Sequence, residues 1–466
     1  MQSDIPGRLD RLPWSRWHLL VVGVLAVTWL LDGLEGSLGG SLAGALKTRD
    51  GLALTDAQLG LSSSVYLAGA VLGAFFFGYL ADRYGRRRLF NWTLILYLCA
   101  TAATGLSWSL WSFTFFRVLT GAGIGGEYAA INSAVDELIP ARLRGRIDLW
   151  INATFWLGII LGSIVSSTLL ATHFLGTRLG WRVAFCSGVP IGIVVLFLRR
   201  YVPESPRWLL TRGRRAEAEI EMRIVESKVT GLDVSSIRDL STTNLKTEPE
   251  SPCRRLLMLL GPLYRRRALL CFALMTAQAF FYNSVFFSLG LVLLRYYGVA
   301  AEDLGYFFIP VAVTNFFGPV ALGWFFDSVG RKPMISTTYI LSGLVLLGSS
   351  WLFLHGRLNV HAQVAWWSAA FFFASCAASS AYLTVSELFP QSVRATSIAL
   401  FYALGTLAGG TFGPLVFGRL IGSASRWSLF YGYAAGSFVM IGAGIAQLFW
   451  GVASERRSLE ELAPEH

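Results

Sequence analysis

Twelve long apolar stretches constrain this chain of 466 residues more than any other feature. A helix that crosses a bilayer needs about 20 mostly apolar residues, and its backbone groups must pair within the segment. Six such stretches precede a polar region and six follow it. They cover residues 17–46, 58–81, 89–108, 111–139, 147–175, 182–202, 267–297, 303–326, 334–355, 362–388, 393–421 and 427–453. The sequence therefore predicts an all-α membrane protein with twelve transmembrane helices.

The composition supports a membrane protein and argues against one that binds nucleic acid. Only 14% of the residues are charged, whereas soluble proteins carry about 25%. The formal net charge of +11 comes from basic residues in short turns between apolar stretches, as the positive-inside rule expects. We therefore expect a monomer embedded in the lipid bilayer of the cell (inner) membrane, with both termini cytoplasmic and no nucleic-acid partner.

A charged turn in the first half of the chain recurs in the second half. The segment 78–88 and the segment 323–332 share a spacing of Gly, Asp, Gly and basic residues, each between two apolar stretches. A second pair follows the same logic, because 137–144 and 387–394 both run from Glu-Leu-x-Pro to an arginine. A repeat of about half the chain in an apolar sequence indicates a duplicated membrane domain.

These repeated turns resemble the signature of the major facilitator superfamily. The segment 203–209, Pro-Glu-Ser-Pro-Arg-Trp-Leu, resembles the sugar-porter and organic-ion-transporter branches. The run 32–35, Asp-Gly-Leu-Glu, is similar to the Asp-Gly-x-Asp of proton-coupled aromatic-acid carriers. Tyr382 and Asn152 depart from sugar porters, which usually carry Trp and Gln there. The resemblance implies two pseudo-symmetric six-helix halves and secondary transport, and it leaves the substrate open.

The expected division of the chain follows from the apolar stretches and the polar region between them. It comprises a cytoplasmic arm (1–16), a first six-helix half (17–202), a cytoplasmic linker with short amphipathic helices (203–265), a second six-helix half (266–453) and a cytoplasmic tail (454–466). Residues 212–227 have the pattern of a short amphipathic helix.

Four charged residues within apolar stretches are the candidates for proton coupling: Glu35, Asp32, Arg117 and Glu127. An ionised side chain in lipid is costly, so these residues must face a cavity or pair with one another. We expect Glu35, more than Asp32, to pair with Arg117 when it is ionised and to release Arg117 when it takes a proton. A permanent structural ion pair is the alternative. Glu127 is equally consistent with a second proton site, a substrate contact or a brace between packed helices.

Polar and aromatic residues near the predicted midplane are the candidates for substrate binding, because transporter sites lie there between the halves. They are Asn152, Trp156, Gln278, Tyr282, Asn283, Asn315 and Tyr382. Amides with aromatic walls suit a neutral polyol or a small acid equally well. Hydrogen bonding between helices is the alternative role for these side chains.

A set of acids, arginines and glycines at the predicted cytoplasmic helix ends is the candidate inner gate. It consists of Gly78, Asp82, Arg83, Gly85, Arg86, Glu137, Arg144, Glu204, Arg207, Gly323, Asp327, Gly330, Arg331, Glu387 and Arg394. Salt bridges among them would hold the inner side shut in one state and break in the other. Anchoring of the topology by positive charge is the simpler alternative.

The predicted function is secondary active transport of a small polar metabolite, either a sugar or polyol or a small organic or aromatic acid. Alternating access with proton symport is favoured; a proton-driven exporter, an uncoupled facilitator of organic ions and a non-transporting solute sensor are alternatives. The sequence has no Gly-x-x-x-x-Gly-Lys motif, and its five histidines are scattered, so ATP drive and a catalytic base are not indicated. We expect no enzyme activity, no cofactor and no metal.

Overall fold

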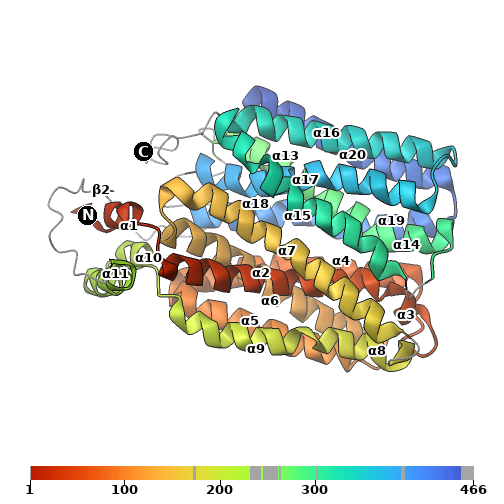
Figure 1. The fold of residues 1–466 in the computed structure, drawn as a ribbon, viewed down its shortest axis with the longest axis horizontal. Coiled ribbons are helices and arrows are strands. Elements are labelled where there is room, and N and C mark those ends of the chain that lie inside the picture. The colour runs from red at the N-terminus through yellow and green to blue at the C-terminus, as the bar shows by residue number, and fades with distance from the viewer. Residues whose placement is uncertain are drawn as a thin grey trace.

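The computed structural model describes residues 2–171, 175–230, 243–244, 261, 264–300, 303–389 and 394–452. Within these ranges, long helices run side by side as a single bundle (Figure 1). The helices of the first half of the chain lie on one side of the bundle, and those of the second half lie on the other. The all-α fold class predicted from the apolar stretches is therefore confirmed.

The first half contains six membrane-spanning segments in the described part of the chain. They are α2 (Arg16–Ser41), α4 (Asp56–Tyr84), α5 (Arg86–Gly105), α6 (Leu110–Leu138), α7 (Ala141–Leu170) and the run formed by α8 (Gly176–Cys186), α9 (Gly188–Leu198) and η1 (Arg199–Tyr201). Short helices α1 (Ile5–Arg11) and α3 (Ala43–Lys47) flank α2, and α10 (Pro206–Thr211) and α11 (Arg215–Thr230) follow η1.

The second half repeats this arrangement among the described residues. Its spans are α13 (Arg265–Phe280) continued by η2 (Phe281–Phe286) and α14 (Phe287–Tyr297), α15 (Leu304–Ser328), α16 (Arg331–Leu354), α17 (Val360–Leu388), α18 (Arg394–Gly405) continued by η3 (Thr406–Thr411) and α19 (Phe412–Gly422), and α20 (Arg426–Trp450). The only sheet in the described ranges is a two-residue antiparallel pair of β1 (Gln2–Ser3) and β2 (Thr243–Asn244).

Ten stretches of the described chain are long and apolar enough to cross a membrane by composition alone. The other two spans, α5 and α6, are more polar than their neighbours: α5 begins with three arginines, and α6 contains Arg117 and Glu127. Both of these side chains in α6 are buried inside the protein and form ion pairs there. In α5 the arginines stand at the helix end, where Arg87 and Arg88 are exposed. Charges that are paired in the bundle or placed at a helix end explain why these two spans fail a test of hydropathy and still belong to it.

The predicted boundaries differ from the observed ones most at α7. A helix was expected from residue 147, after a basic loop, but α7 begins at Ala141. The basic residues 142–146 therefore occupy the first turns of the helix and not a loop. Pro140, immediately before α7, can begin the helix without the loss of a hydrogen bond, because the first helical residues have no intrahelical acceptor.

Glycines set the closest helix pairs of the first half. A side chain at Gly33 of α2 would collide with the backbone oxygen of Phe155, and one at Gly158 of α7 would collide with that of Leu30. In the same way, Gly121 and Gly125 of α6 meet the backbone of α4, as their small-x-x-x-small spacing predicts. Pairs α2–α7 and α4–α6 thus pack backbone to backbone, which fixes the rotation of the helices that carry the buried charges.

The π-helical segments η2 and η3 interrupt two spans of the second half at mid-length. They pack against each other and against α13. A side chain at Gly409 of η3 would collide with the backbone oxygen of Thr276 in α13. A π-helical turn changes the hydrogen-bond ladder locally and is frequent at functional sites. Two of them side by side mark this part of the bundle for closer attention.

Short helices gather at one end of the bundle, where α1, α10 and α11 lie together (Figure 1). The predicted amphipathic helix of the linker is present as α11. Arg8 of α1 donates hydrogen bonds to Glu226 at 2.6 and 2.8 Å and to Glu219 at 2.8 and 3.0 Å. These bonds, first that to Glu226, raise the pKa of Arg8 above its ordinary value. The N-terminal helix is therefore clamped to the linker helix.

Candidate functional site

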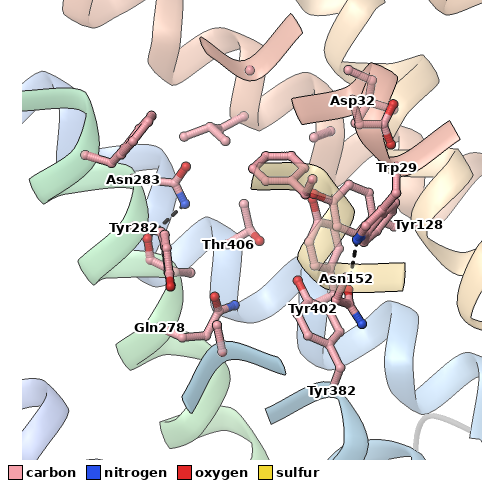
Figure 2. A pocket seen from close by; sticks show the side chains of 18 of the residues that line it. Trp29, Asp32, Tyr128, Asn152, Gln278, Tyr282, Asn283, Tyr382, Tyr402 and Thr406 are labelled. Atoms are coloured by element: carbon pink, nitrogen blue, oxygen red, sulfur yellow. Dashed lines mark hydrogen bonds between the residues drawn. The ribbon is translucent and has the colours of Figure 1, made fainter. Parts of the chain in front are cut away.

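A cavity of about 230 Å³ lies between the two halves. Residues of α2, α4, α6 and α7 form one wall, and residues of α13, η2, α17, α18 and η3 form the other. Figure 2 shows how side chains from both walls converge on it. Six of the seven predicted substrate-binding residues line the cavity: Asn152, Trp156, Gln278, Tyr282, Asn283 and Tyr382.

Asn315 is the predicted binding residue that does not line this cavity. It is fully buried in α15 and accepts a hydrogen bond of 2.8 Å at Oδ1 from the hydroxyl of Tyr282. Its Nδ2 donates to the backbone oxygen of Val311 at 2.8 Å. Asn315 therefore orients a cavity residue from behind, and its expected direct contact with the substrate is not supported by its position.

Aromatic rings that the sequence did not single out form much of the wall. Trp29, Tyr66, Tyr128 and Tyr402 all line the cavity. The ring centroids of Trp29 and Tyr128 are 4.4 Å apart, and those of Tyr128 and Tyr402 are 5.0 Å apart in a stacked arrangement. One signal was available for Trp29, which lies three residues before Asp32 and hence on the same helix face. Tyr128 and Tyr402 carry no comparable signal in the sequence.

The amide side chains of the cavity are held in defined orientations. Trp29 donates from Nε1 to Oδ1 of Asn152 at 3.0 Å, which joins α2 to α7 across the wall (Figure 2). Asn283 donates from Nδ2 to the backbone oxygen of Ala279 at 2.8 Å. Gln278 lies one turn earlier, near the sulfur of Met275. Amides that are fixed in this way offer a ligand hydrogen bonds of defined direction.

Glu35 and Arg117 form a buried ion pair behind the cavity. Nη1 of Arg117 lies 2.5 Å from Oε1 of Glu35, and the two side chains are 4% and 1% exposed. The second oxygen, Oε2, accepts no hydrogen bond from any residue in the described ranges. The guanidinium also lies over the ring of Tyr66, 4.2 Å from its centroid. Since Tyr66 lines the cavity, the ion pair is one side chain away from a ligand there.

Glu127 has a partner that the sequence did not suggest. It pairs with Arg199 at the end of the sixth span, and both side chains are buried. Arg199 also donates to the backbone oxygen of Phe90 and lies 3.5 Å from the centroid of its ring. Among the three predicted roles of Glu127, a brace between helices fits this position best.

Asp32 differs from the other buried acids. It is 1% exposed and lines the cavity. Neither of its carboxylate oxygens accepts a hydrogen bond from a residue that the structure describes. Glu35, the acid expected to be more important, is instead turned toward Arg117. The two acids of one helix face therefore have separate environments.

Two glycines of the predicted inner gate have similar backbone conformations at equivalent places in the two halves. Gly85 precedes α5 with a φ of 96°, and Gly330 precedes α16 with a φ of 114°; only glycine adopts such angles without strain. At Gly85 a side chain would also meet Oε2 of Glu204, which accepts a hydrogen bond from the backbone N–H of Arg87 at 3.3 Å. The repeated turns in the sequence thus form the same structure in both halves.

The ionic part of the predicted gate is visible for one pair. Arg331 pairs with Glu387, which joins α16 to α17 within the second half. Arg207 is buried at the start of α10, and Gly78 and Gly323 lie within α4 and α15. The side chains of Asp82, Arg83, Arg86, Glu137, Arg144, Asp327 and Arg394 lie outside those that the structure describes.

Comparison with known proteins identifies the family. The chain matches the family described as "Sugar (and other) transporter" over residues 40–465. It is 27% identical to the niacin transporter of Acinetobacter baylyi over 414 residues, which is 89% of each chain. It is 24% identical to the 4-hydroxybenzoate transporter of the same organism, over 91% of this chain and 89% of the other. The plastidic glucose transporter 4 of Arabidopsis thaliana is 29% identical, over 95% and 79%.

A solved structure has the same fold. The major facilitator superfamily proton:xylose symporter XylE, bound to 6-bromo-6-deoxy-D-glucose, superimposes with a TM-score of 0.76 over 95% of this chain and 98% of the other, at 20% identity. The twelve spans, the repeated turns and the cavity between the halves are thus the features of an established fold. The chain belongs to the sugar (and other) transporter family, its fold is that of the major facilitator superfamily, and it is a multi-pass membrane transporter of a small metabolite.

Proposed function

We propose that this protein moves a small, ring-containing polar metabolite through alternating access, together with a proton. The observation that carries the proposal is the buried pair of Glu35 and Arg117, one ring away from a cavity between the halves. Relatives named for niacin, 4-hydroxybenzoate and glucose support a single-ring substrate with polar groups. The cavity, at about 230 Å³, is below the usual range for drug-sized ligands.

The coupling follows from the cost of buried charge. Glu35 and Arg117 cancel each other while both are ionised, and removal of one charge leaves the other unpaired at a cost of about 3–5 kcal/mol. When Glu35 takes a proton, Arg117 needs a new partner, and the Tyr66 ring beneath it is also a wall of the cavity. Proton binding and ligand binding therefore act on the same side chains, which is the requirement for linkage between them.

We also propose an orientation in the cell membrane with the end that carries α1, α10 and α11 in the cytoplasm. Supporting this, the basic residues 86–88 and 199–200 lie at the ends of α5 and η1, near Glu204 and α10. A predominance of arginine on one side marks the cytoplasmic face of a membrane protein. We propose that the protein acts as a monomeric carrier without enzyme activity, cofactor or nucleic-acid partner.

Transport by the purified protein in liposomes tests the proposal. The first step is a thermal-shift screen of sugars, aromatic acids and aromatic amines, because ligand binding stabilises the folded state. The compound that binds is then supplied outside, with an inwardly directed gradient of about one pH unit. Such a gradient supplies about 1.4 kcal/mol per proton, enough for about tenfold accumulation.

The Glu35→Gln variant should exchange the compound across the membrane but no longer accumulate it. Glu217→Gln, on the exposed surface of α11, is the matched control and should accumulate like the parent protein. Accumulation by Glu35→Gln equal to that of the control would remove the proposed proton site. If the parent protein accumulates the compound equally with and without the pH gradient, proton symport is excluded.

A further inference from the structure

The cavity carries one formal charge among the residues that line it, and that charge is negative. Asp32 is the acid, and neither arginine nor lysine is present in the lining. The two arginines closest to the acids of the first half are already engaged: Arg117 with Glu35, and Arg199 with Glu127. Direct charge pairing within the protein therefore accounts for both glutamates. Asp32 interacts with Arg199 only electrostatically, without a hydrogen bond, and faces the cavity.

The carboxylate of Asp32 lacks the contacts that a buried acid needs. Within the described ranges no residue donates a hydrogen bond to either oxygen, although the side chain is 1% exposed. A buried carboxylate without donors is costly, because both oxygens lose their hydration. A ligand that brings a charged donor would satisfy both oxygens at once.

Aromatic rings next to Asp32 favour the same kind of ligand. Figure 2 places Asp32 beside Trp29, with Tyr128 further along the same wall, and the ring of Tyr402 reaches Tyr128 from the second-half wall. The faces of such rings carry negative potential and attract cations, with Trp the strongest. The rings also provide a flat surface against which a planar ligand can stack, since Tyr128 and Tyr402 are themselves stacked. A carboxylate beside an aromatic wall is an arrangement that recognises a protonated nitrogen.

We propose that the transported molecule carries a protonated nitrogen on or near a single planar ring, and that Asp32 binds this nitrogen. This inference rests on the proposed function and narrows its substrate class. The ring lies against Trp29, Tyr128 and Tyr402, while Gln278 and Asn283 on the opposite wall bind the polar group at the other end of the ligand. A carboxylate ligand finds no basic side chain in this lining and meets the charge of Asp32.

A matched set of three probes tests the charge preference. Tyramine, 4-ethylphenol and 4-hydroxyphenylacetate share a phenol ring and differ in carrying a cation, no charge and an anion. Binding to the purified full-length protein is measured by isothermal titration calorimetry at neutral pH. We expect tyramine to bind at least tenfold more tightly than 4-ethylphenol, and 4-hydroxyphenylacetate to bind most weakly.

Substitution of Asp32 shows whether this residue sets the preference. Asp32→Asn should bind tyramine and 4-ethylphenol within about threefold of each other, because the amide keeps the size and loses the charge. Asp32→Glu should keep a preference for the amine, and it supplies a second variant if Asp32→Asn does not fold. Asp56→Asn, at an exposed ion pair with Lys47, is the control and should behave as the parent protein.

Three results would overturn the inference: no saturable binding of tyramine, tightest binding of 4-hydroxyphenylacetate, or an unchanged preference in Asp32→Asn. Each is separable from a failure of the proposed function. If 4-hydroxyphenylacetate accumulates with protons in liposomes while tyramine does not bind, the carrier mechanism stands and the cationic substrate is excluded. If tyramine binds through Asp32 but crosses the membrane without regard to the pH gradient, the substrate class stands and symport does not.

Discussion

The two halves of the molecule share a fold and differ in the polar groups that they bury. The first half contains five buried charged side chains within its spans: Asp32, Glu35, Arg117, Glu127 and Arg199. The buried polar residues within the spans of the second half are amides and hydroxyl groups, such as Gln278 and Asn315, with Glu387 near a helix end. Among the described residues, the buried charges within the spans are therefore concentrated in the first half, and Glu387 is the one near a helix end in the second.

The helices that carry these groups differ in the same way. In the first half, α2, α4, α6 and α7 reach the cavity as continuous α-helices, packed backbone to backbone at glycines. In the second half, two helices pass through the π-helical segments η2 and η3 at the cavity. The halves also differ in their hydrophobic cores. The buried apolar residues of the second half form one large cluster, and those of the first half form three smaller clusters.

This contrast suggests a division of tasks. Ion pairs in a low-dielectric interior require fixed geometry, because a small loss of alignment leaves charges unpaired. Amides that contact a ligand tolerate small changes in position, and a π-helical turn permits such changes in the local backbone. We infer that the first half senses the proton and the second half adapts to the ligand. The predictions that follow test this division, beginning with the largest effect.

Loss of Arg199 should be the most damaging single change. Arg199→Ala leaves Glu127 buried and unpaired, at a cost of about 3–5 kcal/mol in the free energy of unfolding. Thermal unfolding in detergent, followed by tryptophan fluorescence or calorimetry, measures the loss. The adjacent Arg200→Ala, on the exposed side, should change stability by less than about 0.5 kcal/mol.

A double variant sharpens this prediction. Arg199→Leu combined with Glu127→Gln removes both charges and should recover more than half of the loss, because no charge remains unpaired. A double variant as unstable as Arg199→Ala would show that packing around Arg199, including its contact with the ring of Phe90, outweighs the ion pair.

The second prediction concerns the close approach of η3 to α13. Gly409→Ala places a methyl group against the backbone oxygen of Thr276, so the two segments must separate, at about 1–3 kcal/mol. If the second half adapts to the ligand through this contact, uptake should fall at least fivefold while ligand binding in detergent changes less. Gly442→Ala, where a side chain meets open space, should leave uptake unchanged.

The third prediction addresses the clamp between α1 and α11, which lies at one end of the bundle, outside the spans of both halves. Arg8→Ala removes the bonds to Glu226 and Glu219 and should lower the unfolding free energy by about 2 kcal/mol. The pKa of Arg8 is raised in the folded protein, so this contribution is complete below the pKa of Arg8 in the unfolded chain and is lost only as the pH rises above that value. Arg8 stays protonated from about pH 7 to 10, so the difference in unfolding free energy between Arg8→Ala and the parent protein should be constant over that range. A difference that varies there would point to another group.

The smallest effect is expected for a single cavity amide. Gln278→Ala should weaken ligand binding by about tenfold, the value of one lost hydrogen bond of about 1.4 kcal/mol. The number of protons carried per ligand should not change, because Gln278 belongs to the half that lacks the buried ion pairs Glu35–Arg117 and Glu127–Arg199. A change in that ratio would contradict the division between the halves. Ser342→Ala, buried in α16 away from the cavity lining, is the control.

The sequence was sufficient for the architecture, because apolar length and repeated turns are local properties. It also identified six cavity residues, since amides and aromatic rings inside an apolar stretch must have a polar neighbour. The sequence was insufficient to predict which buried acid pairs with which arginine. Glu35, Asp32 and Glu127 compete for Arg117 and Arg199, and only the rotation of the packed helices decides which acid meets which base. The pairing of Arg199 with Glu127 and the place of Asn315 behind the cavity could not be predicted for this reason, because sequence neighbours do not reveal the direction of a side chain.

The ion pair of Glu35 and Arg117 has a consequence for the order of events in the transport cycle. One oxygen of Glu35 accepts from the guanidinium, and the other, Oε2, has no donor among the described residues. A proton can therefore arrive at the vacant oxygen before the bond to Arg117 breaks. The carboxyl group becomes neutral while it is still held in place, and the guanidinium departs afterwards. No step in that sequence requires a bare carboxylate in the low-dielectric interior. The remaining cost is that of the unpaired Arg117 guanidinium, so we infer that exchange becomes favourable only when water or a ligand reaches that side chain.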